Sequence, residues 1–145
     1  MPKVKRTRSI DAPVREVWDL VSDPHHLPRW WPAVERVEEA DALRWTKVFG
    51  TGAGKTVRAD YTRVLAEEPS RLVWRQELAA SPFERIMSSS EVEIALEPED
   101  AATRVRLTAT QRLRGLSRFG SFMIRRATRR QLDQALAALE EVLAR

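Results

Sequence analysis

The range 9–32 constrains the fold more than any other part of the chain. Its apolar residues recur at helical spacing after Asp11, a residue type favoured at helix N-caps. Pro13 suits the start of that helix, where its missing N–H has no partner to lose. The helix must end before Pro24, because a residue that precedes proline avoids the α conformation. The pattern predicts a strand over 3–10, a helix over 13–22 and a short helix over about 24–31 in a tryptophan-rich corner.

Period-2 alternation and turn-forming residues divide the rest of the chain into strands and one long helix. The predicted strands cover 34–39, 43–50, 56–66, 71–78, 83–96 and 103–113, and the final helix covers about 117–144. Residues 50–54, rich in glycine, form a flexible connection. No internal repeat or linker is visible, so the sequence predicts an α+β fold.

Two of the predicted strands alternate regularly enough to assign their faces. One shared face carries Ile86, Ser88, Ser90, Val92, Ile94, Leu96, Val105, Leu107, Ala109, Gln111 and Leu113. Because this face is largely apolar, another element must cover it. The final helix is the only element long enough to do so.

The final helix changes character along its length. Its second half carries an apolar stripe made of Leu132, Leu136, Leu139 and Leu143. Extended toward the N-terminus at 100° per residue, the stripe reaches Thr128, Arg125 and Ser121, with Ile124 at its edge. A filled core does not accept an arginine without a partner. The pattern therefore predicts a partly open cavity beneath the first half of the helix.

The order of these elements resembles the SRPBCC superfamily of START-related, polyketide cyclase/dehydrase-like proteins. The most specific match is the opening sequence IDAPVREVWDLVSDP, followed by LPRWWP at 27–32. The resemblance covers nearly the whole chain and implies one helix-grip domain over 1–145. It implies a curved antiparallel sheet of six to seven strands, two short N-terminal helices, and a ligand cavity between the sheet and a long C-terminal helix. A fold of this kind does not by itself identify the ligand.

Composition agrees with a globular domain. The chain has 145 residues, enough for one buried core, and a net charge of +4 that comes mostly from arginine. It has no cysteine, which excludes disulfides and thiolate chemistry. No apolar run approaches the length of a membrane span, and the N-terminus lacks a signal-peptide pattern. These features predict a cytoplasmic location.

Two motifs that suggest chemistry have simpler explanations. The sequence GTGAGKT at 50–56 looks like a phosphate-binding loop, but Phe49 stands where the motif requires its first glycine. His25 and His26 are the only histidines, and no cysteine is present to complete a metal site. We predict no metal site, and neither motif nor resemblance implies a cofactor.

The predicted cavity residues are aromatic side chains and polar side chains on otherwise apolar faces. Trp30 and Trp31 are adjacent in a helix, so they point in different directions. Either one points toward the core and the other toward the cavity rim, or both anchor the corner in the core. Gln76 shares a strand face with Trp74 and needs a partner if it is buried. The full set is Trp30, Trp31, Tyr61, Arg63, Trp74, Gln76, Ser88, Ser90, Gln111, Ile124, Arg125 and Thr128.

The resemblance also implies catalytic residues. In the aromatase/cyclase members an arginine near the end of the equivalent strand points into the cavity, and Arg63 matches that position. Those members use a tyrosine shortly after the Trp/Pro corner, where this chain has Val34. If the chain is an enzyme, we expect aldol-type cyclisation or dehydration, with Arg63 stabilising an enolate and Tyr61 as general acid/base. The sequence leaves open which face of 56–66 points inward.

Two classes of function follow. The first is binding of a hydrophobic or amphipathic small molecule in the cavity, with or without the enzymatic step. The second is an interaction protein whose basic final helix contacts a membrane, a ribosome or nucleic acid through Arg125, Arg126, Arg129 and Arg130. We favour the first, because charge runs on amphipathic helices are commonly solvent-facing surfaces.

Overall fold

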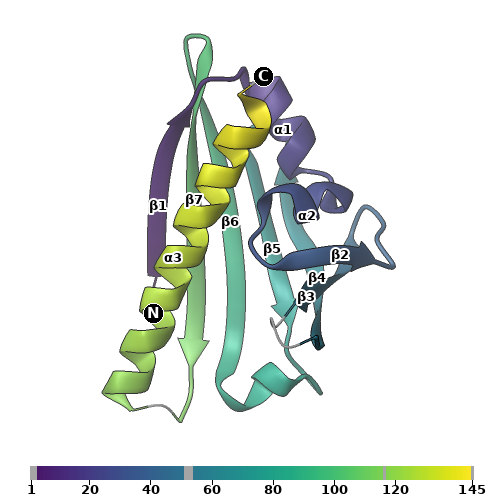
Figure 1. The fold of residues 1–145 in the computed structure, drawn as a ribbon, viewed down its shortest axis with the longest axis vertical. Coiled ribbons are helices and arrows are strands. Elements are labelled where there is room, and N and C mark those ends of the chain that lie inside the picture. Colours follow the sequence, from purple (N-terminus) through teal and green to yellow (C-terminus); the bar gives the residue numbers. More distant parts are fainter. Residues whose placement is uncertain (1–2, 51–53, 116, 145) are drawn as a thin grey trace.

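A single antiparallel sheet organises the molecule, seen in a computed structural model that describes residues 3–50, 54–115 and 117–144. Its seven strands follow the order β1-β7-β6-β5-β4-β3-β2 (Figure 1). They are β1 (Lys3–Ile10), β2 (Val34–Glu38), β3 (Arg44–Gly50), β4 (Thr56–Glu67), β5 (Arg71–Glu77), β6 (Met87–Glu99) and β7 (Ala102–Leu113). The sheet and the helices below confirm the predicted α+β helix-grip fold.

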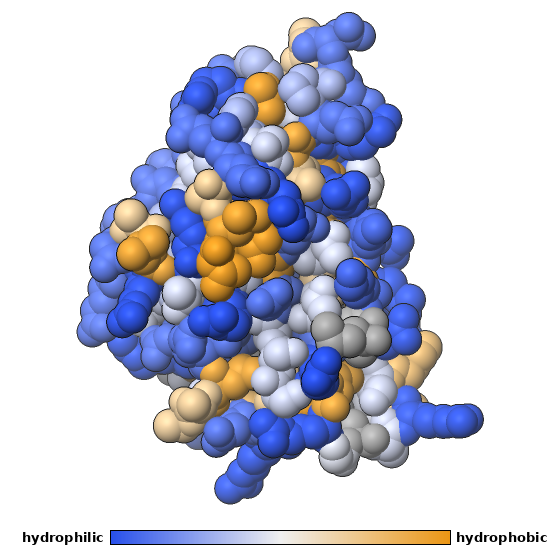
Figure 2. Space-filling view, turned by 180° about the vertical axis from the view of Figure 1, so that it is seen from behind, coloured by the Kyte–Doolittle hydropathy of each residue, from blue (hydrophilic) through white to orange (hydrophobic). Residues whose placement is uncertain are grey.

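The helices lie on one face of this sheet. They are α1 (Val14–Val21), η1 (Pro24–His26), α2 (Leu27–Trp30), η2 (Pro82–Arg85) and α3 (Arg118–Leu143), of which η1 and η2 are single turns of 3₁₀ helix. The long helix α3 runs diagonally across the sheet and packs on β1, β7, α1 and α2 (Figure 1). The opposite face of the sheet carries mainly hydrophilic side chains (Figure 2). This arrangement gives the sheet one buried and one solvated face, as the alternation predicted.

The N-terminal corner begins later than predicted. Asp11 does not cap α1; the N-cap is Pro13, and no side chain accepts a capping hydrogen bond there. The reason is a tight turn in which the Ala12 N–H bonds to the Ile10 carbonyl, so the chain is not yet helical at that point. The side-chain cap occurs one element further on, where Asp23 accepts a hydrogen bond from the His25 N–H at the start of η1.

The predicted strand 83–96 is also corrected at its beginning. Ser81 caps the turn η2, and β6 starts only at Met87. A register shift lies between Met87 and Ser89, where β6 pairs with β7. This bulge reverses the local alternation, so that Met87 is buried and Ser88 is exposed. From Ser90 onward the predicted inward face is correct.

The two halves of α3 differ, as the leucine stripe predicted, but the phase of the first half is different. Leu132, Leu136 and Leu139 are buried in the core, on the side of α3 that faces the sheet and α1. From the buried Thr128 the inward face continues to the half-buried Ile124, four residues earlier, and not to Arg125, which is exposed. The prediction that Arg125 faces the sheet was therefore wrong. A spacing of four follows the helical turn more closely than a spacing of three does over this short distance.

Candidate functional site

A cavity of about 330 Å³ lies between the sheet and the middle of α3. We call it the aromatic cavity. It is lined by Trp31, Lys47, Phe49, Val57, Tyr61, Trp74, Gln76, Phe83, Met87, Ser90, Val92, Ala109, Gln111 and Gln131. Most of these residues come from the concave face of β3 to β7, Trp31 comes from the N-terminal corner, Phe83 from η2 and Gln131 from α3.

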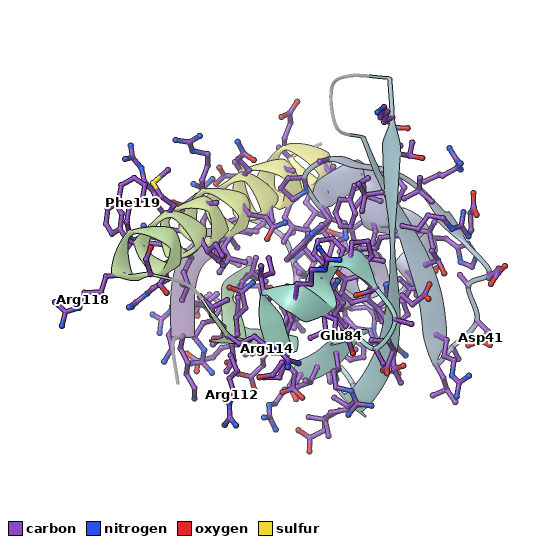
Figure 3. All side chains as sticks on the ribbon, turned by 90° about the horizontal axis from the view of Figure 1, so that it is seen from below. Asp41, Glu84, Arg112, Arg114, Arg118 and Phe119 are labelled. Carbon is purple, nitrogen blue, oxygen red and sulfur yellow. The ribbon has the colours of Figure 1, made fainter. Side chains whose placement is uncertain are left out.

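Figure 3 views the molecule from the end at which α3 begins. Arg118 and Phe119 extend outward from the first turn of α3, while η2, which carries Glu84, crosses the same end of the molecule. The side chain of Phe119 is 73% exposed. Phe122 and Met123 are exposed as well, so Ile124 is the large apolar side chain that the first turns of α3 direct inward, and this is where the leucine stripe is interrupted.

Five aromatic side chains in and beside the cavity wall form one connected cluster: Trp30, Trp31, Trp45, Tyr61 and Trp74. The ring of Trp74 lies at its centre, with its centroid 5.5 Å from that of Trp31 and 5.7 Å from that of Trp45, both in edge-to-face geometry. Tyr61 stacks on Trp45, with centroids 6.2 Å apart. Such contacts add to the stability gained from burial and hold the rings in fixed orientations. The cavity wall is therefore largely preformed.

The two tryptophans at the corner take different positions. Trp30, inside α2, is 1% exposed and belongs to the core. Trp31 is the C-cap of α2, where the backbone turns to an extended conformation, and its ring lines the aromatic cavity. The two rings meet edge to face, with centroids 5.4 Å apart.

Lys47 is the most unusual of the lining residues that the sequence prediction missed. It lies in the middle of β3, opposite Ala59 of β4, and has no exposed surface. Among the described residues its Nζ finds no hydrogen-bond partner. The same atom lies 4.1 Å from the ring centroid of Tyr61, 4.4 Å from that of Trp31 and 4.7 Å from that of Trp74. One signal was present in the sequence, because Trp45, Lys47 and Phe49 alternate on one strand face.

Burial controls the chemistry of this lysine. Loss of hydration lowers the pKa of Lys47 well below its usual value of 10.5. The surrounding ring faces oppose this effect, because a cation over an aromatic face gains about 0.5–2 kcal/mol. Removing an ammonium from water costs several kcal/mol. Desolvation is thus the larger effect, and the neutral amine gains population relative to an exposed lysine.

Burial disfavours the charged form of Tyr61 as it does for Lys47, but for a tyrosine this raises the pKa. Desolvation raises the pKa of Tyr61 above its ordinary value of 10.0. The phenol therefore keeps its proton at neutral pH and remains a hydrogen-bond donor.

The structure also shows which face of β4 points inward. Ala59 and Tyr61 are buried, which places Val57 and Arg63 on the same inward face.

Polar side chains occupy the rest of the wall. Gln76 is buried on β5 opposite Tyr61, and Ser90 is buried on β6 opposite Gln111. The hydroxyl of Thr128 donates to the Ile124 carbonyl at 2.9 Å and also lies 3.4 Å from Oε1 of Gln111. Thr128 therefore supports the wall through Gln111 and is not itself part of the lining.

Arg63 has a structural partner outside the aromatic cavity. Its guanidinium donates a hydrogen bond to the carbonyl of Ser22, at the C-terminal end of α1. Burial lowers the pKa of Arg63, and the nearby carboxylate of Asp23 opposes that shift. A guanidinium at the end of a helix bonds a carbonyl that has no helical partner. The structure thus connects β4 to α1 through Arg63.

The twelve predicted residues divide into two sets. The structure brings together Trp31, Tyr61, Trp74, Gln76, Ser90 and Gln111 around the aromatic cavity. It places the others elsewhere: Trp30 in the core, Arg63 at α1, Ser88 and Arg125 on the surface, and Ile124 and Thr128 beside the lining. Phe83 and Met87 were missed, because the turn η2 and the bulge in β6 bring them inward.

Neither a metal site nor a membrane-spanning helix is found in the part of the chain that the structure describes. No group of three or more histidine, cysteine, aspartate or glutamate side chains is arranged to hold a metal ion among these residues. The same residues include no helix with the length and apolar character needed to cross a membrane. His25 is exposed at the start of η1, with Nδ1 2.9 Å from Asp23 Oδ1, and residues 51–53 of the glycine-rich sequence lie outside the described residues.

A curved antiparallel sheet that grips a long helix over an apolar cavity defines an SRPBCC-class, helix-grip protein. The chain belongs to the polyketide cyclase/dehydrase and lipid transport family, whose model matches residues 1–144. No functionally curated protein matches the sequence.

Solved structures show the same fold. The di-domain ARO/CYC protein BexL from the BE-7585A biosynthetic pathway matches with a TM-score of 0.77 and 27% identity, over 97% of this chain and 46% of that one. The chain thus spans about half the length of that protein. A protein from Thermus thermophilus matches with a TM-score of 0.75 and 24% identity, over 99% and 97% of the two chains. A START superfamily protein from Mycobacterium smegmatis matches with a TM-score of 0.78 and 13% identity, over 98% and 97%.

Proposed function

We propose that the protein binds a flat, hydrophobic small molecule that carries oxygen groups, and that it does so in the aromatic cavity. The observation that carries the proposal is the composition of the wall. Trp31, Trp74 and Phe83 offer apolar ring surface, while Gln76 and Gln111 offer amide donors and acceptors. Pockets of this kind gain affinity from apolar contact and orientation from a few polar groups.

The ligand class that fits this wall best is an aromatic or polyketide-like compound. The family to which the chain belongs is described by polyketide cyclisation or dehydration and by lipid transport. A cyclase-type step would use Tyr61 as the proton donor, because its buried phenol stays protonated. Arg63 is bonded to α1, so the cationic side chain on the described cavity lining is Lys47.

The test of binding is a fluorescence titration with naphthalen-2-ylmethanol, which has a flat ring system and one hydroxyl. Trp31 and Trp74 line the aromatic cavity, so we expect saturable quenching of tryptophan emission with one molecule bound. Ala109→Phe fills the cavity from β7 and should abolish saturable quenching. Ala127→Phe, on the exposed side of α3, is the matched control and should bind as the wild type does. Equal binding by both variants would place the ligand elsewhere and refute the proposal.

An anionic membrane surface is the second candidate partner, and it rests on the first turns of α3. Phe119, Phe122 and Met123 are exposed there, next to Arg125 and Arg126. Exposed apolar side chains among arginines suit the boundary of a lipid layer better than the surface of a nucleic acid. Cosedimentation with phosphatidylglycerol vesicles should decrease as salt rises and should be lost in a Phe119→Ser, Phe122→Ser variant. No cosedimentation at low salt would remove this candidate.

A further inference from the structure

Lys47 is the most unusual polar group of the molecule. Buried side-chain nitrogens nearly always have a hydrogen-bond partner, and buried lysines usually pair with a carboxylate. Lys47 Nζ has no such partner among the described residues, and no described residue of the cavity lining is acidic. The residue lies in the wall of the aromatic cavity, within 4.1–4.7 Å of three ring centroids. An apolar side chain would fill this position at a lower free-energy cost, so packing alone does not explain why a lysine is found here.

The surroundings of Lys47 favour reaction over ion pairing. A lysine that lies in an apolar pocket without a counter-ion is activated as a nucleophile, because its neutral amine has a free electron pair. The desolvation described above acts in this direction. The same wall carries the amides of Gln76 and Gln111 and the hydroxyl of Ser90, which are groups that can bind the oxygen groups of a ligand.

We propose that Lys47 captures a carbonyl-bearing ligand as a reversible imine in the aromatic cavity. The inference rests on the proposed function, since the ligand must first bind there. Nζ attacks the carbonyl carbon of an aldehyde or ketone and forms a carbon–nitrogen bond. The carbon–oxygen bond then breaks, and the oxygen leaves as water with the two protons that the amine loses. No oxidant, reductant or cofactor takes part in the step, and hydrolysis reverses it.

The burial of Lys47 also restricts which carbonyl compounds react. The amine has no exposed surface, because the rings of Trp31, Tyr61 and Trp74 surround it. A carbonyl group therefore reaches Nζ only from within the aromatic cavity, whose wall includes Lys47. The remaining lysines, Lys3, Lys5 and Lys55, are exposed and react only according to the concentration of the aldehyde in water.

The experiment uses naphthalene-2-carbaldehyde, the aldehyde that matches the alcohol probe above. The intact protein is mixed with the aldehyde and sodium cyanoborohydride at pH 7, which reduces an imine to a stable secondary amine. Peptide mass spectrometry then locates the naphthylmethyl group on each of the four lysines. We expect Lys47 to be labelled faster than each exposed lysine, because burial lowers its pKa and so raises the fraction of free amine at pH 7.

Two variants keep the result interpretable. Lys47→Met removes the amine but keeps the length and apolar stem of the side chain; it should lose the label at position 47. Ala109→Phe blocks the cavity and should protect Lys47 from the aldehyde while Lys3 and Lys5 are labelled at their usual rate. This second variant tests the inference even if Lys47→Met fails to fold.

The outcomes separate the two proposals. Labelling confined to Lys3, Lys5 and Lys55, together with normal binding of the alcohol, would overturn the imine and leave the proposed binding site intact. Labelling of Lys47 that Ala109→Phe does not reduce would also overturn it, because the amine would then react without the cavity. Absence of both alcohol binding and Lys47 labelling would reject the binding site and the imine together.

Discussion

The two ends of the interior are built from the same sheet and the same helix, yet they are filled differently. At the end near α1 the space is closed by aliphatic side chains, among them Val17, Val105, Leu107, Leu136 and Leu139, none of which is more than 1% exposed. At the other end the sheet contributes tryptophans, a tyrosine, amides and one lysine, and it leaves a cavity of about 330 Å³. The first end holds the fold together, and the second end provides room for a ligand.

This difference arises mainly from α3. The second half of α3 directs leucines toward the sheet, while the first half directs Thr128 and Ile124 toward it. Other large apolar side chains of the first half, such as Phe119, are exposed. A helix that continued its leucine stripe to the first turn would fill the cavity. The second half of α3 therefore stabilises the fold, while the first half leaves space for a ligand.

The largest expected effect is at the filled end. Leu139→Ala should lower the free energy of unfolding by about 2–5 kcal/mol, because the buried leucine leaves a void that tightly packed neighbours do not close. The matched change at the other end is Met87→Ala, which only enlarges a space that exists already, so we expect a loss at or below the lower limit of that range. Urea denaturation of the two variants measures both values. Equal losses would contradict the contrast between the two ends.

The second prediction concerns Arg63. Arg63→Met removes a hydrogen bond from a charged donor to the Ser22 carbonyl, and such bonds contribute about 1.5–3 kcal/mol. Arg58→Met is the control on the same strand, because Arg58 forms an exposed ion pair with Glu38 that solvent screens, so its loss should change stability little. Binding of naphthalen-2-ylmethanol should be unchanged in both. Loss of binding without loss of stability in Arg63→Met would instead assign Arg63 to the ligand.

Most of the fold was predictable from the sequence because its signals are local and repeat along each element. The proline-bounded helices, the alternation in β7 and the leucines of α3 each fix an element without knowledge of the others. The errors lie where a single backbone event overrides a repeating pattern. The turn after Ile10 delays α1, and the bulge at Met87 turns Ser88 outward.

The site was less predictable, because it depends on which side chains meet across strands. Trp74 and Gln76 were predicted from their shared strand face, and Trp31 from its place in the tryptophan-rich corner. Tyr61 was predicted without a decision on which face of its strand points inward. Lys47 was not, because an isolated lysine in a strand normally lies on the solvated face. Only the pairing of β3 with β4 shows that Lys47 shares its face with Tyr61, so that rings surround it.

The third prediction is an increase in stability. Lys47→Met should raise the free energy of unfolding by about 1–3 kcal/mol at pH 7, since it removes a buried polar group that has no hydrogen bond. The gain should shrink as the pH rises. The pKa of Lys47 is lower in the folded chain than in the unfolded chain, so between these two values the unfolded state binds the extra proton. Stability of the wild type then increases with pH toward about 10, where the unfolded lysine also loses its proton. Thermal unfolding of both proteins between pH 6 and about 9.5 measures this; a gain that does not change with pH would show that Lys47 is an ordinary ammonium.

The smallest expected effect is at Thr128, where the filled end gives way to the cavity. Thr128→Val keeps the branched shape but removes the hydroxyl that lies 3.4 Å from Gln111 Oε1. We expect a loss of about 0.5–1.5 kcal/mol, the net value of one hydrogen bond, because the Ile124 carbonyl accepting at 2.9 Å is also a helical acceptor and keeps its backbone partner. The second readout is affinity for naphthalen-2-ylmethanol, which should fall by less than about tenfold, equivalent to 1.4 kcal/mol, because Gln111 loses a support and keeps its place in the wall. Gln111→Leu, which removes the amide itself, should weaken binding more than Thr128→Val does. If the two variants bind equally well, the amide does not contact the ligand, and orientation in the aromatic cavity must come from Gln76, Ser90 and Lys47 on β5, β6 and β3.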